Sequence, residues 1–451
     1  MEKYSTVLLL SIAFLTGIFV LNGIDLPELN WDKASSKENY GEIQLDKNEA
    51  IDFRYKLSGY NISTVEKRPK RCPNHYSVWE PLSEMNCTFT EKGASQVTLI
   101  TDAANYVDTP LGNRDYSLEQ LDSVFTPWDL EFLPNGHRIV TSRTGEVYVN
   151  GGNKAEKVAD INVIEKGETG LLGLAVHPKF EENRFVYLYY TYRRADKREK
   201  NAFKPFPVKN RVSRFRLEEN LTGEKILLDE IPGNKYHSGG RLEFGPDNKL
   251  YISTGDAGSA PKDHDKPQKL DFLGGKVLRI NPNGTVPEGN PFNQSYIYSR
   301  GHRNPQGLAW NPENGNLYTT EHGQWRHDEI NRIVPGGNYG WGETQCNEPM
   351  YGNPTQEMIS PVRCYKNWTM APSGTTFVRN QSSPWYGDMF VTGLRGSHLS
   401  RLSIENNTVT KENIFYFSQN LGTQHRLRDV EYQNGSLWVI GDSKGLAKIT
   451  P

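Results

Sequence analysis

The chain lacks a strong excess of charge of either sign. Its 451 residues include 52 Lys and Arg against 54 Asp and Glu, which gives a formal net charge of −2. Such a balance creates no general attraction to nucleic acids or to anionic membranes, so any cationic site must be local. We therefore expect no nucleic-acid partner.

The sequence is also poor in hydrophobic residues. Only 36% of the residues are hydrophobic, whereas glycine (41), proline (26) and tyrosine (23) are abundant. Frequent turn residues and many aromatic residues are typical of many short strands rather than of a helical bundle. We predict an all-β protein.

Cysteine is scarce, with four residues in the whole chain. Cys72 and Cys87 form one local pair and Cys346 and Cys364 another, and neither pair has the C-x-x-C spacing of a zinc or redox site. We interpret the pairs as short disulfide loops, with the connectivity left open. Because disulfides persist in oxidising compartments, this interpretation favours an exported protein.

Motifs of several common enzyme classes are missing. The sequence contains no helix-borne H-E-x-x-H, no G-x-S-x-G of the nucleophile-elbow type and no G-x-G-x-x-G that opens a helix. These absences argue against a zinc protease, an α/β-hydrolase and a nicotinamide-dependent dehydrogenase.

One long hydrophobic run does occur, at residues 7–21, and it follows Lys3. The pattern indicates export, and residues 1–23 are either a cleaved signal peptide or a retained membrane anchor. Sequons of the N-x-[ST] type, which suit a glycosylated exterior protein, begin at Asn61, Asn86, Asn220, Asn283, Asn293, Asn367, Asn380, Asn406 and Asn434. We expect an extracytoplasmic protein, either membrane-anchored or secreted.

A short unit recurs along most of the chain. Each copy has a proline or asparagine turn, a β-type run and then a glycine or charged break, as in GPDNKLYISTGD and QNGSLWVIGDSKG. The turns begin near Pro134, Pro178, Pro246, Pro312, Pro384 and Asn434, with spacings from 44 to 72 residues.

Six copies predict the six blades of a β-propeller. A four-stranded blade needs about 40 to 50 residues, so the wider spacings leave room for long loops, where such folds build ligand sites. We assign residues 119–451 to the propeller and residues 24–118 to a linker and a short, irregular, cysteine-containing extension. A large β-sandwich with accidental turn similarity is the alternative.

Four loop segments between the repeats are dense in polar residues: KYHSGGRL, GHRNPQGLAW, EHGQWRHDEINRIVPGGNYGW and QHRLRDV. In the first, His237 stands before paired glycines, so it is either packed in a turn or exposed as a base with open space beside it. In the second, Arg303, Asn304 and Gln306 offer a guanidinium and two amides to a flat, oxygen-rich ligand, or they cap a surface turn.

The last of these loops carries Arg426 and Arg428, two residues apart. On a strand both guanidinium groups would lie on one face and repel each other unless an anion lies between them. A multiply charged anionic cofactor would supply that anion. The alternative is a solvated edge on which Asp429 pairs with one arginine.

The third loop contains three carboxylates, Glu321, Asp328 and Glu329, beside a glycine-rich turn. Carboxylate and main-chain oxygens suit calcium. The segment does not follow the EF-hand pattern, and a polar loop without metal is the alternative.

Taken together, the chain resembles the soluble glucose/sorbosone dehydrogenase family over residues 121–451. The segments that carry the resemblance, in order, are PWDLEFLPNG, GETGLLGLAVHPKF, HSGGRLEFGPD, GKVLRINPNGTVPEGNPF, GHRNPQGLAWNP, DEINRIVPGGNYGW, APSG and RLRDV. The resemblance implies a six-bladed propeller that oxidises the C1 hydroxyl of aldose sugars to the lactone. It also implies two cofactors, pyrroloquinoline quinone (PQQ), which accepts the hydride, and calcium.

The resemblance also implies roles for individual residues. His237 matches the catalytic base, Asp256 lies close to it, and Arg303 polarises the quinone oxygen. Implied cofactor-binding positions are Glu168, Arg303, Asn304, Gln306, His322, Arg395, Arg426 and Arg428. The main-chain carbonyls of Gly323 and Gln324 match ligands of the cofactor's calcium, and Glu329 and Tyr339 match a second, structural calcium site.

Five positions depart from the family pattern, among them Gln324, which replaces the usual proline, and His322, where some members have glutamine. Tyr236 stands where some members have an acid beside the base, Ser238 replaces an amide, and Arg395 replaces a lysine. Asp256 is therefore our candidate for orienting His237. The sequence does not identify the preferred aldose or the electron acceptor, and a non-catalytic extracellular propeller that binds a sugar or a protein is the alternative function.

Overall fold

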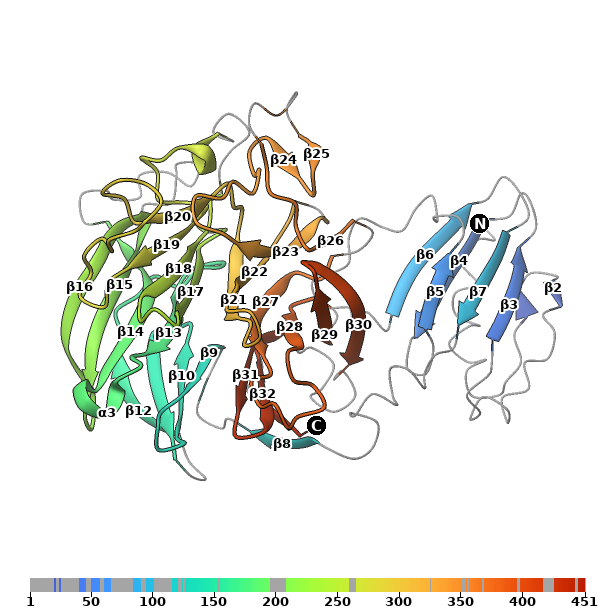
Figure 1. The fold of residues 1–451 in the computed structure, drawn as a ribbon. Helices are drawn as coiled ribbons and strands as arrows, with labels where there is room; N and C mark the ends of the chain where they lie inside the picture. The colour runs from blue at the N-terminus through green and yellow to red at the C-terminus, as the bar shows by residue number, and fades with distance from the viewer. Residues whose placement is uncertain are drawn as a thin grey trace.

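Figure 1 shows the chain as a computed structural model. It describes Val124 and residues 126–450, except 152–154, 195–207, 259–264, 325, 351–353, 355–356, 367–368, 396–397, 417–425 and 443–444. N-terminal to these residues, only the backbone of the short strands β1 to β8 is described.

Six four-stranded antiparallel sheets form the blades of a propeller (Figure 1). The first blade comprises β9 (Pro127–Phe132), β10 (Arg138–Ser142), β11 (Glu146–Asn150) and β12 (Ala155–Asp160). The second comprises β13 (Leu171–Val176), β14 (Phe185–Arg193), β15 (Val208–Leu217) and β16 (Leu221–Pro232). The third comprises β17 (Gly239–Phe244), β18 (Leu250–Thr254), β19 (Lys276–Ile280) and β20 (Ile297–Arg300).

The remaining blades follow the same order along the chain. The fourth comprises β21 (Pro305–Trp310), β22 (Leu317–Glu321), β23 (Asp328–Ile333) and β26 (Arg363–Tyr365). The fifth comprises β27 (Pro372–Phe377), β28 (Met389–Gly393), β29 (His398–Glu405) and β30 (Thr408–Tyr416). Short elements outside the blades are α3 (Phe180–Asn183), η3 (Lys266–Gln268), β24 (Thr344–Gln345) and β25 (Glu348–Pro349).

The sixth blade closes the ring with strands from distant parts of the chain. Its strands β31 (Leu427–Gln433), β32 (Ser436–Gly441) and β33 (Gly445–Ile449) are joined by β8 (Tyr116–Gln120). In this pairing Gly445 lies opposite Gln120, and Ile449 lies opposite Tyr116. The predicted boundary at residue 119 therefore falls inside β8. Because β8 and β33 share one ladder, opening the ring would break main-chain hydrogen bonds.

The first strand of every blade lies at the centre of the propeller. The inner strands β9, β13, β17, β21, β27 and β31 each contact the next, and β31 contacts β9. The six turns predicted from the repeats all lie between the first and second strands of their blades. The prediction of an all-β, six-bladed propeller is confirmed, because the repeating unit was the same inner hairpin in each blade.

The hydrophobic core is divided among the interfaces between neighbouring blades. At the closing interface, Val124, Leu130 and Val140 from the start of the ring pack with Ile440 and Leu446 of the last blade. Most clusters join two neighbouring sheets, and one extends over the first three blades. A sequence with 36% hydrophobic residues can therefore fill a large fold.

Short strands also occur in the segment that we predicted to be irregular. They are β1 (Val20–Leu21), β2 (Ile24–Asp25), β3 (Tyr40–Leu45), β4 (Ala50–Lys56), β5 (Asn61–Val65), β6 (Glu84–Thr90) and β7 (Ser95–Ile100). Strand β7 pairs with β3 and β5, while β4 pairs with β6. Apart from strand backbone, the predicted signal or anchor and the Cys72–Cys87 pair lie outside the described residues.

Two observations on the described residues concern membrane-spanning helices and the predicted glycosylation sites. Among the described residues, no helix has the length and apolar character needed to cross a membrane. The sequon asparagines whose exposure is described are all exposed, at Asn220, Asn283, Asn293, Asn380, Asn406 and Asn434. Export and glycosylation themselves stay predictions.

Candidate active site

The residues that precede three inner strands meet at one end of the propeller's centre, which we call the site end. Glu168 precedes β13, and its carboxylate accepts hydrogen bonds from the main-chain N–H of His237 (2.8 Å) and from the side chain of Asn304 (3.2 Å). Asn304 in turn accepts a bond from the N–H of Gly239 in β17 (3.0 Å). These contacts join three blades through buried or partly buried groups.

His237 has an uncommon backbone conformation, with φ at 58°. A left-handed conformation of a residue other than glycine is sparsely populated and persists only where its surroundings fix it. Here the N–H of Ala257 donates to the His237 carbonyl (3.2 Å), and a Cβ at Gly255 would lie 2.0 Å from that carbonyl oxygen. Glycine at position 255 is thus required for this close approach.

The imidazole of His237 is oriented by Asp256, which follows β18. The His237 Nδ1 lies 2.7 Å from Asp256 Oδ1, and the Asp256 side chain is 1% exposed. A carboxylate accepts hydrogen bonds, so Nδ1 carries the proton and Nε2 is left with a lone pair. The expected closeness of these two residues is confirmed, and the arrangement suits a base that takes a proton at Nε2.

Both oxygens of the Asp256 carboxylate have further donors. The N–H of Gly258 donates to Oδ1 (2.8 Å), and the indole Nε1 of Trp341 donates to Oδ2 (2.7 Å). The ring of Trp341 also lies 5.2 Å from the guanidinium of Arg303, in a cation–π arrangement.

Arg303 lies at the site end with few partners for its charge. Its Nη1 donates to the carbonyl of His322 (3.0 Å), and its main-chain N–H donates to Glu321. Burial lowers the pKa of the guanidinium, against the opposing influence of Asp256 and Glu168. A buried arginine of this kind favours a negatively charged group beside it.

The charges that act on His322 show that the predicted cationic residues lie near one another. Burial lowers its pKa well below the ordinary value, and the next causes are the positive charges of Arg303, His237, Arg428 and Arg426. A neutral imidazole at this position is consistent with an environment already rich in cations.

Arg426 and Arg428 have a partner that the sequence analysis did not identify. Arg428 binds the Asp442 carboxylate with two hydrogen bonds (3.0 and 3.2 Å), whereas Arg426 lies 3.6 Å from it. Asp429, the alternative partner, instead pairs with Arg241 (3.0 Å). Burial, followed by repulsion from Arg428, lowers the pKa of Arg426 to about 10.

Three buried nitrogen atoms near the site end test whether an anionic cofactor fits. Among the described residues, the Nε atoms of Arg303 and Arg426 and the Nε2 of His322 have no hydrogen-bond partner. Buried polar groups without partners are uncommon and costly. The residues present therefore fit an anionic, oxygen-rich group that would accept from the arginines.

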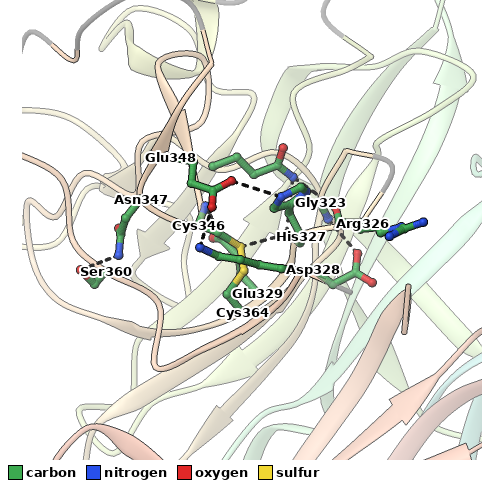
Figure 2. Close-up of a disulfide and its surroundings, with 12 residues drawn as sticks. Gly323, Arg326, His327, Asp328, Glu329, Cys346, Asn347, Glu348, Ser360 and Cys364 are labelled. Atoms are coloured by element: carbon green, nitrogen blue, oxygen red, sulfur yellow. Dashed lines mark hydrogen bonds and ion pairs between the residues drawn. A yellow bond between two sulfur atoms is a disulfide. The ribbon is translucent and has the colours of Figure 1, made fainter. Parts of the chain in front are cut away.

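The predicted calcium residues lie beside a disulfide, Cys346–Cys364 (Figure 2), which confirms one of the two predicted pairs. Glu329 lies opposite Cys364 in the sheet, and its carboxylate accepts from the N–H of Cys346 (2.7 Å). Glu321 lies opposite Glu329 on the other side. Burial, then the Glu321 carboxylate, raises the pKa of Glu329 to about 8.

These carboxylates fit calcium only in part. Two facing buried acids would favour a cation, but Glu321 and Glu329 already accept hydrogen bonds at every carboxylate oxygen, including those from His302 and Asn331. Asp328 is occupied by the N–H groups of Gly323, Met370 and Ala371. Within the described chain, no three acidic, histidine or cysteine side chains form a metal-binding group.

One small pocket is shared by the two sets of residues. Arg303, His322 and Gly323 line it together with Glu329, Tyr339 and Trp341. Main-chain oxygens are therefore the ligands through which calcium would bind here, although the carbonyl of Gln324 already accepts from the N–H of Arg326 (2.7 Å).

Two predicted cofactor residues are not joined to this group. The side chain of Gln306 accepts from Ser373 (3.4 Å), and its carbonyl accepts from Arg241 (3.0 Å), so it is bound between the inner strands. Arg395 approaches the start of β27 through its main chain, which donates to Met370 (3.1 Å). Among the described residues, no hydrogen bond or ion pair joins its side chain to His237 or Arg303.

The sequence analysis missed Trp341 and Asp442. Trp341 ends the marker segment DEINRIVPGGNYGW, so a lone tryptophan after a glycine turn was the available signal. Asp442 had no local signal, because it reaches Arg428 from the turn between β32 and β33.

Known proteins are similar to this chain over the propeller. The glucose/sorbosone dehydrogenase family profile matches residues 124–448. Quinoprotein glucose dehydrogenase B of Acinetobacter calcoaceticus is 36% identical over 283 residues, covering 55% of this chain and 58% of the relative. Aldose sugar dehydrogenase YliI of Escherichia coli is 30% identical over 358 residues, covering 73% of this chain and 91% of the relative.

A solved structure gives the same result. The PQQ-bound aldose sugar dehydrogenase of Streptomyces coelicolor is 30% identical and superposes with a TM-score of 0.60, covering 74% of this chain and 98% of that one. With most of the propeller matched in both sequence and structure, the chain belongs to the glucose/sorbosone dehydrogenase family of sugar oxidoreductases.

Proposed function

We propose that the protein is an exported PQQ-dependent aldose dehydrogenase that oxidises the C1 hydroxyl of its sugar to the lactone. The observation that carries this proposal is the His237–Asp256 contact of 2.7 Å, which leaves Nε2 as a proton acceptor at an end of the propeller where buried arginine nitrogens lack hydrogen-bond partners. A binding module would need no oriented proton acceptor. The similarity to a quinoprotein glucose dehydrogenase and to a PQQ-bound aldose dehydrogenase supports the same choice.

In this proposal, bound PQQ supplies a two-electron acceptor for the hydride that leaves C1. His237 takes the proton of the C1 hydroxyl at Nε2, while Asp256 stabilises the imidazolium that forms. Arg303 stabilises the negative charge that develops on the acceptor side. The two electrons then pass to an external acceptor that the residues do not identify.

The other chain groups bind and orient. Asn304, Arg426 and Arg428 hold the anionic cofactor, with Glu168 fixing the backbone of His237. Gly323 and Gln324 would offer main-chain carbonyls to a calcium ion, which would supply a Lewis acid, whereas the hydrogen bonds already made by the Glu329 carboxylate do not favour the second calcium site predicted at Glu329 and Tyr339. We assign no role to Gln306 and Arg395 in this proposal, because their side chains are not joined to this group.

The test is to reconstitute the purified protein with calcium and PQQ and to follow dye reduction with a panel of aldoses. We expect turnover, and we expect H237A to lower kcat by at least about 100-fold, since general-base catalysis contributes about that much or more. The matched control is H137A, at the β9–β10 turn, which should turn over like the unmutated protein. Equal loss in both variants would contradict the role of His237, and failure to bind PQQ at micromolar concentrations would overturn the proposed function.

A further inference from the structure

Trp341 connects the proposed base to the proposed electrophilic arginine. Its indole N–H donates to Asp256 Oδ2 (2.7 Å), while Asp256 Oδ1 faces His237 Nδ1 (2.7 Å). The same indole ring lies 5.2 Å from the Arg303 guanidinium. One side chain therefore contacts two groups that belong to different blades.

The backbone at Trp341 is itself fixed on both sides. Its N–H donates to the carbonyl of Gly301 (2.8 Å), two residues before Arg303, and its carbonyl accepts from Gln268 (3.0 Å). A few residues further on, Cys346 is joined to Cys364 of β26 (Figure 2). The segment that presents the indole is thus tied to the third blade by hydrogen bonds and to the fourth by a covalent bond.

A fixed donor on Oδ2 restricts rotation of the carboxylate. His237 Nδ1 needs Oδ1 in the plane of its ring, and the His237 side chain is 19% exposed, so without that partner the ring has space to turn. A hydrogen bond to an ionised carboxylate is among the stronger ones in proteins. Loss of the indole N–H should therefore disorder the imidazole without emptying the site.

We propose that Trp341 is a positioning residue, which holds the Asp256 carboxylate and thereby keeps His237 Nε2 directed toward the substrate. It acts through Asp256 and does not itself transfer a proton. The catalytic consequence rests on the proposed function, whereas the orientation of His237 can be measured in protein without cofactor.

The experiment compares W341F, which keeps an aromatic ring beside Arg303 but lacks the N–H, with W341H, whose ring can still donate. The matched control is W438F on β32, where the indole contacts Phe132 and Arg138 and its Nε1 has no partner among the described residues. The first readout is the rate at which diethyl pyrocarbonate modifies His237 in cofactor-free protein, measured by mass spectrometry. The second is kcat and KM after reconstitution.

We expect W341F to raise the His237 modification rate at least about threefold and to lower kcat about 10-fold to 100-fold with KM changed less than about threefold, as for loss of a hydrogen bond to a charged group. W341H should recover part of both effects, and W438F should match the unmutated protein. The double variant W341F/D256A should be no more altered than D256A alone, because the two changes act through one contact.

If one of the variants W341F and W341H does not fold, the other still tests the positioning role of Trp341. A modification rate in W341F equal to that in W438F, or additive effects with D256A, would overturn the positioning role, as would W341H modified as fast as D256A. If no aldose is oxidised but His237 modification follows the expected order, the proposed function fails and the positioning of His237 by Trp341 stands.

Discussion

The two ends of the propeller's inner strands carry different buried ionisable groups. At the site end, Arg303, Arg426 and His322 have buried nitrogens without partners. At the far end, Glu131, Glu243 and Glu431 occupy the fifth position of β9, β17 and β31, near Arg379. Burial raises the pKa of Glu131 to about 8 and that of Glu243 to about 7, the latter despite opposing positive charge from Arg379.

An ion cluster separates these ends. Arg241, at the third position of β17, contacts Asp129 and Asp429 at the third positions of β9 and β31, and all three are buried. Glycines occupy the same position in the other inner strands, and at Gly374 a Cβ would lie 1.8 Å from Asp429. The comparison teaches that one scaffold can accommodate buried ionisable groups in two ways: the glutamates of the far end bind protons, and the arginines of the site end are suited to bind an anion.

The largest effect should come from removing the cluster between the ends. R241M leaves two buried carboxylates without their cation, so we expect the free energy of unfolding to fall by about 3 kcal/mol or more. Urea denaturation measures the change. R216A, which breaks the exposed pair with Glu218, is the control and should cost less than about 1 kcal/mol. A loss as small as that of R216A would show that the buried cluster does not hold the inner strands together.

The second-largest effect should be a loss of cofactor affinity at the site end without a matching loss of stability. R426A removes a cation that is repelled by Arg428, so the free energy of unfolding should change by less than about 1 kcal/mol, while PQQ affinity falls about 10-fold to 100-fold. Fluorescence titration and urea denaturation give the two numbers. K225A, which removes one charge from the exposed outer strand β16, should leave affinity unchanged. Unchanged affinity in R426A would remove that arginine from the cofactor site.

The smallest effect should appear at the acidic end as a pH dependence. Folding raises the pKa of Glu131 from the ordinary value of 4.5 to about 8. The protonated Glu131 therefore contributes its full stability below about pH 4.5, and this contribution is lost as the pH rises through 8. The carboxyl is partly exposed, so we expect E131Q to exceed the unmutated protein by only about 1 kcal/mol at pH 9 and to match it at about pH 5. Thermal unfolding across this range, with the exposed E405Q as control, checks the sign. A gain at pH 5 but none at pH 9 would contradict it.

Much of the fold was predictable because its signals are local. The turns at Pro134 through Asn434 depend on a few adjacent residues, and they identified the inner hairpin of every blade. The closeness of His237 and Asp256 also followed from the family resemblance. Their surroundings did not, because the contacts join segments far apart in sequence: Trp341 reaches Asp256 across 85 residues, and Glu168 reaches Asn304 across 136.

The ion-pair partners of Arg428 and Asp429 were equally hard to predict from the sequence. Asp429 follows Arg428 directly and was the alternative partner on sequence grounds, yet alternation along β31 directs it to Arg241 while Asp442 binds Arg428. Such choices depend on which blades close the ring. Local sequence patterns contain little of that information.

The account's central claim is that the converging arginines and the buried nitrogens without hydrogen-bond partners at the site end form the binding site of an anionic quinone. Titration of the purified, calcium-loaded protein with PQQ tests it most directly. We expect saturable binding of one PQQ per chain with a dissociation constant at or below about 1 μM, a free energy of about −8 kcal/mol or better, weakened in R426A and kept in K225A. No saturable binding up to about 100 μM, or equal binding by the two variants, would contradict the claim.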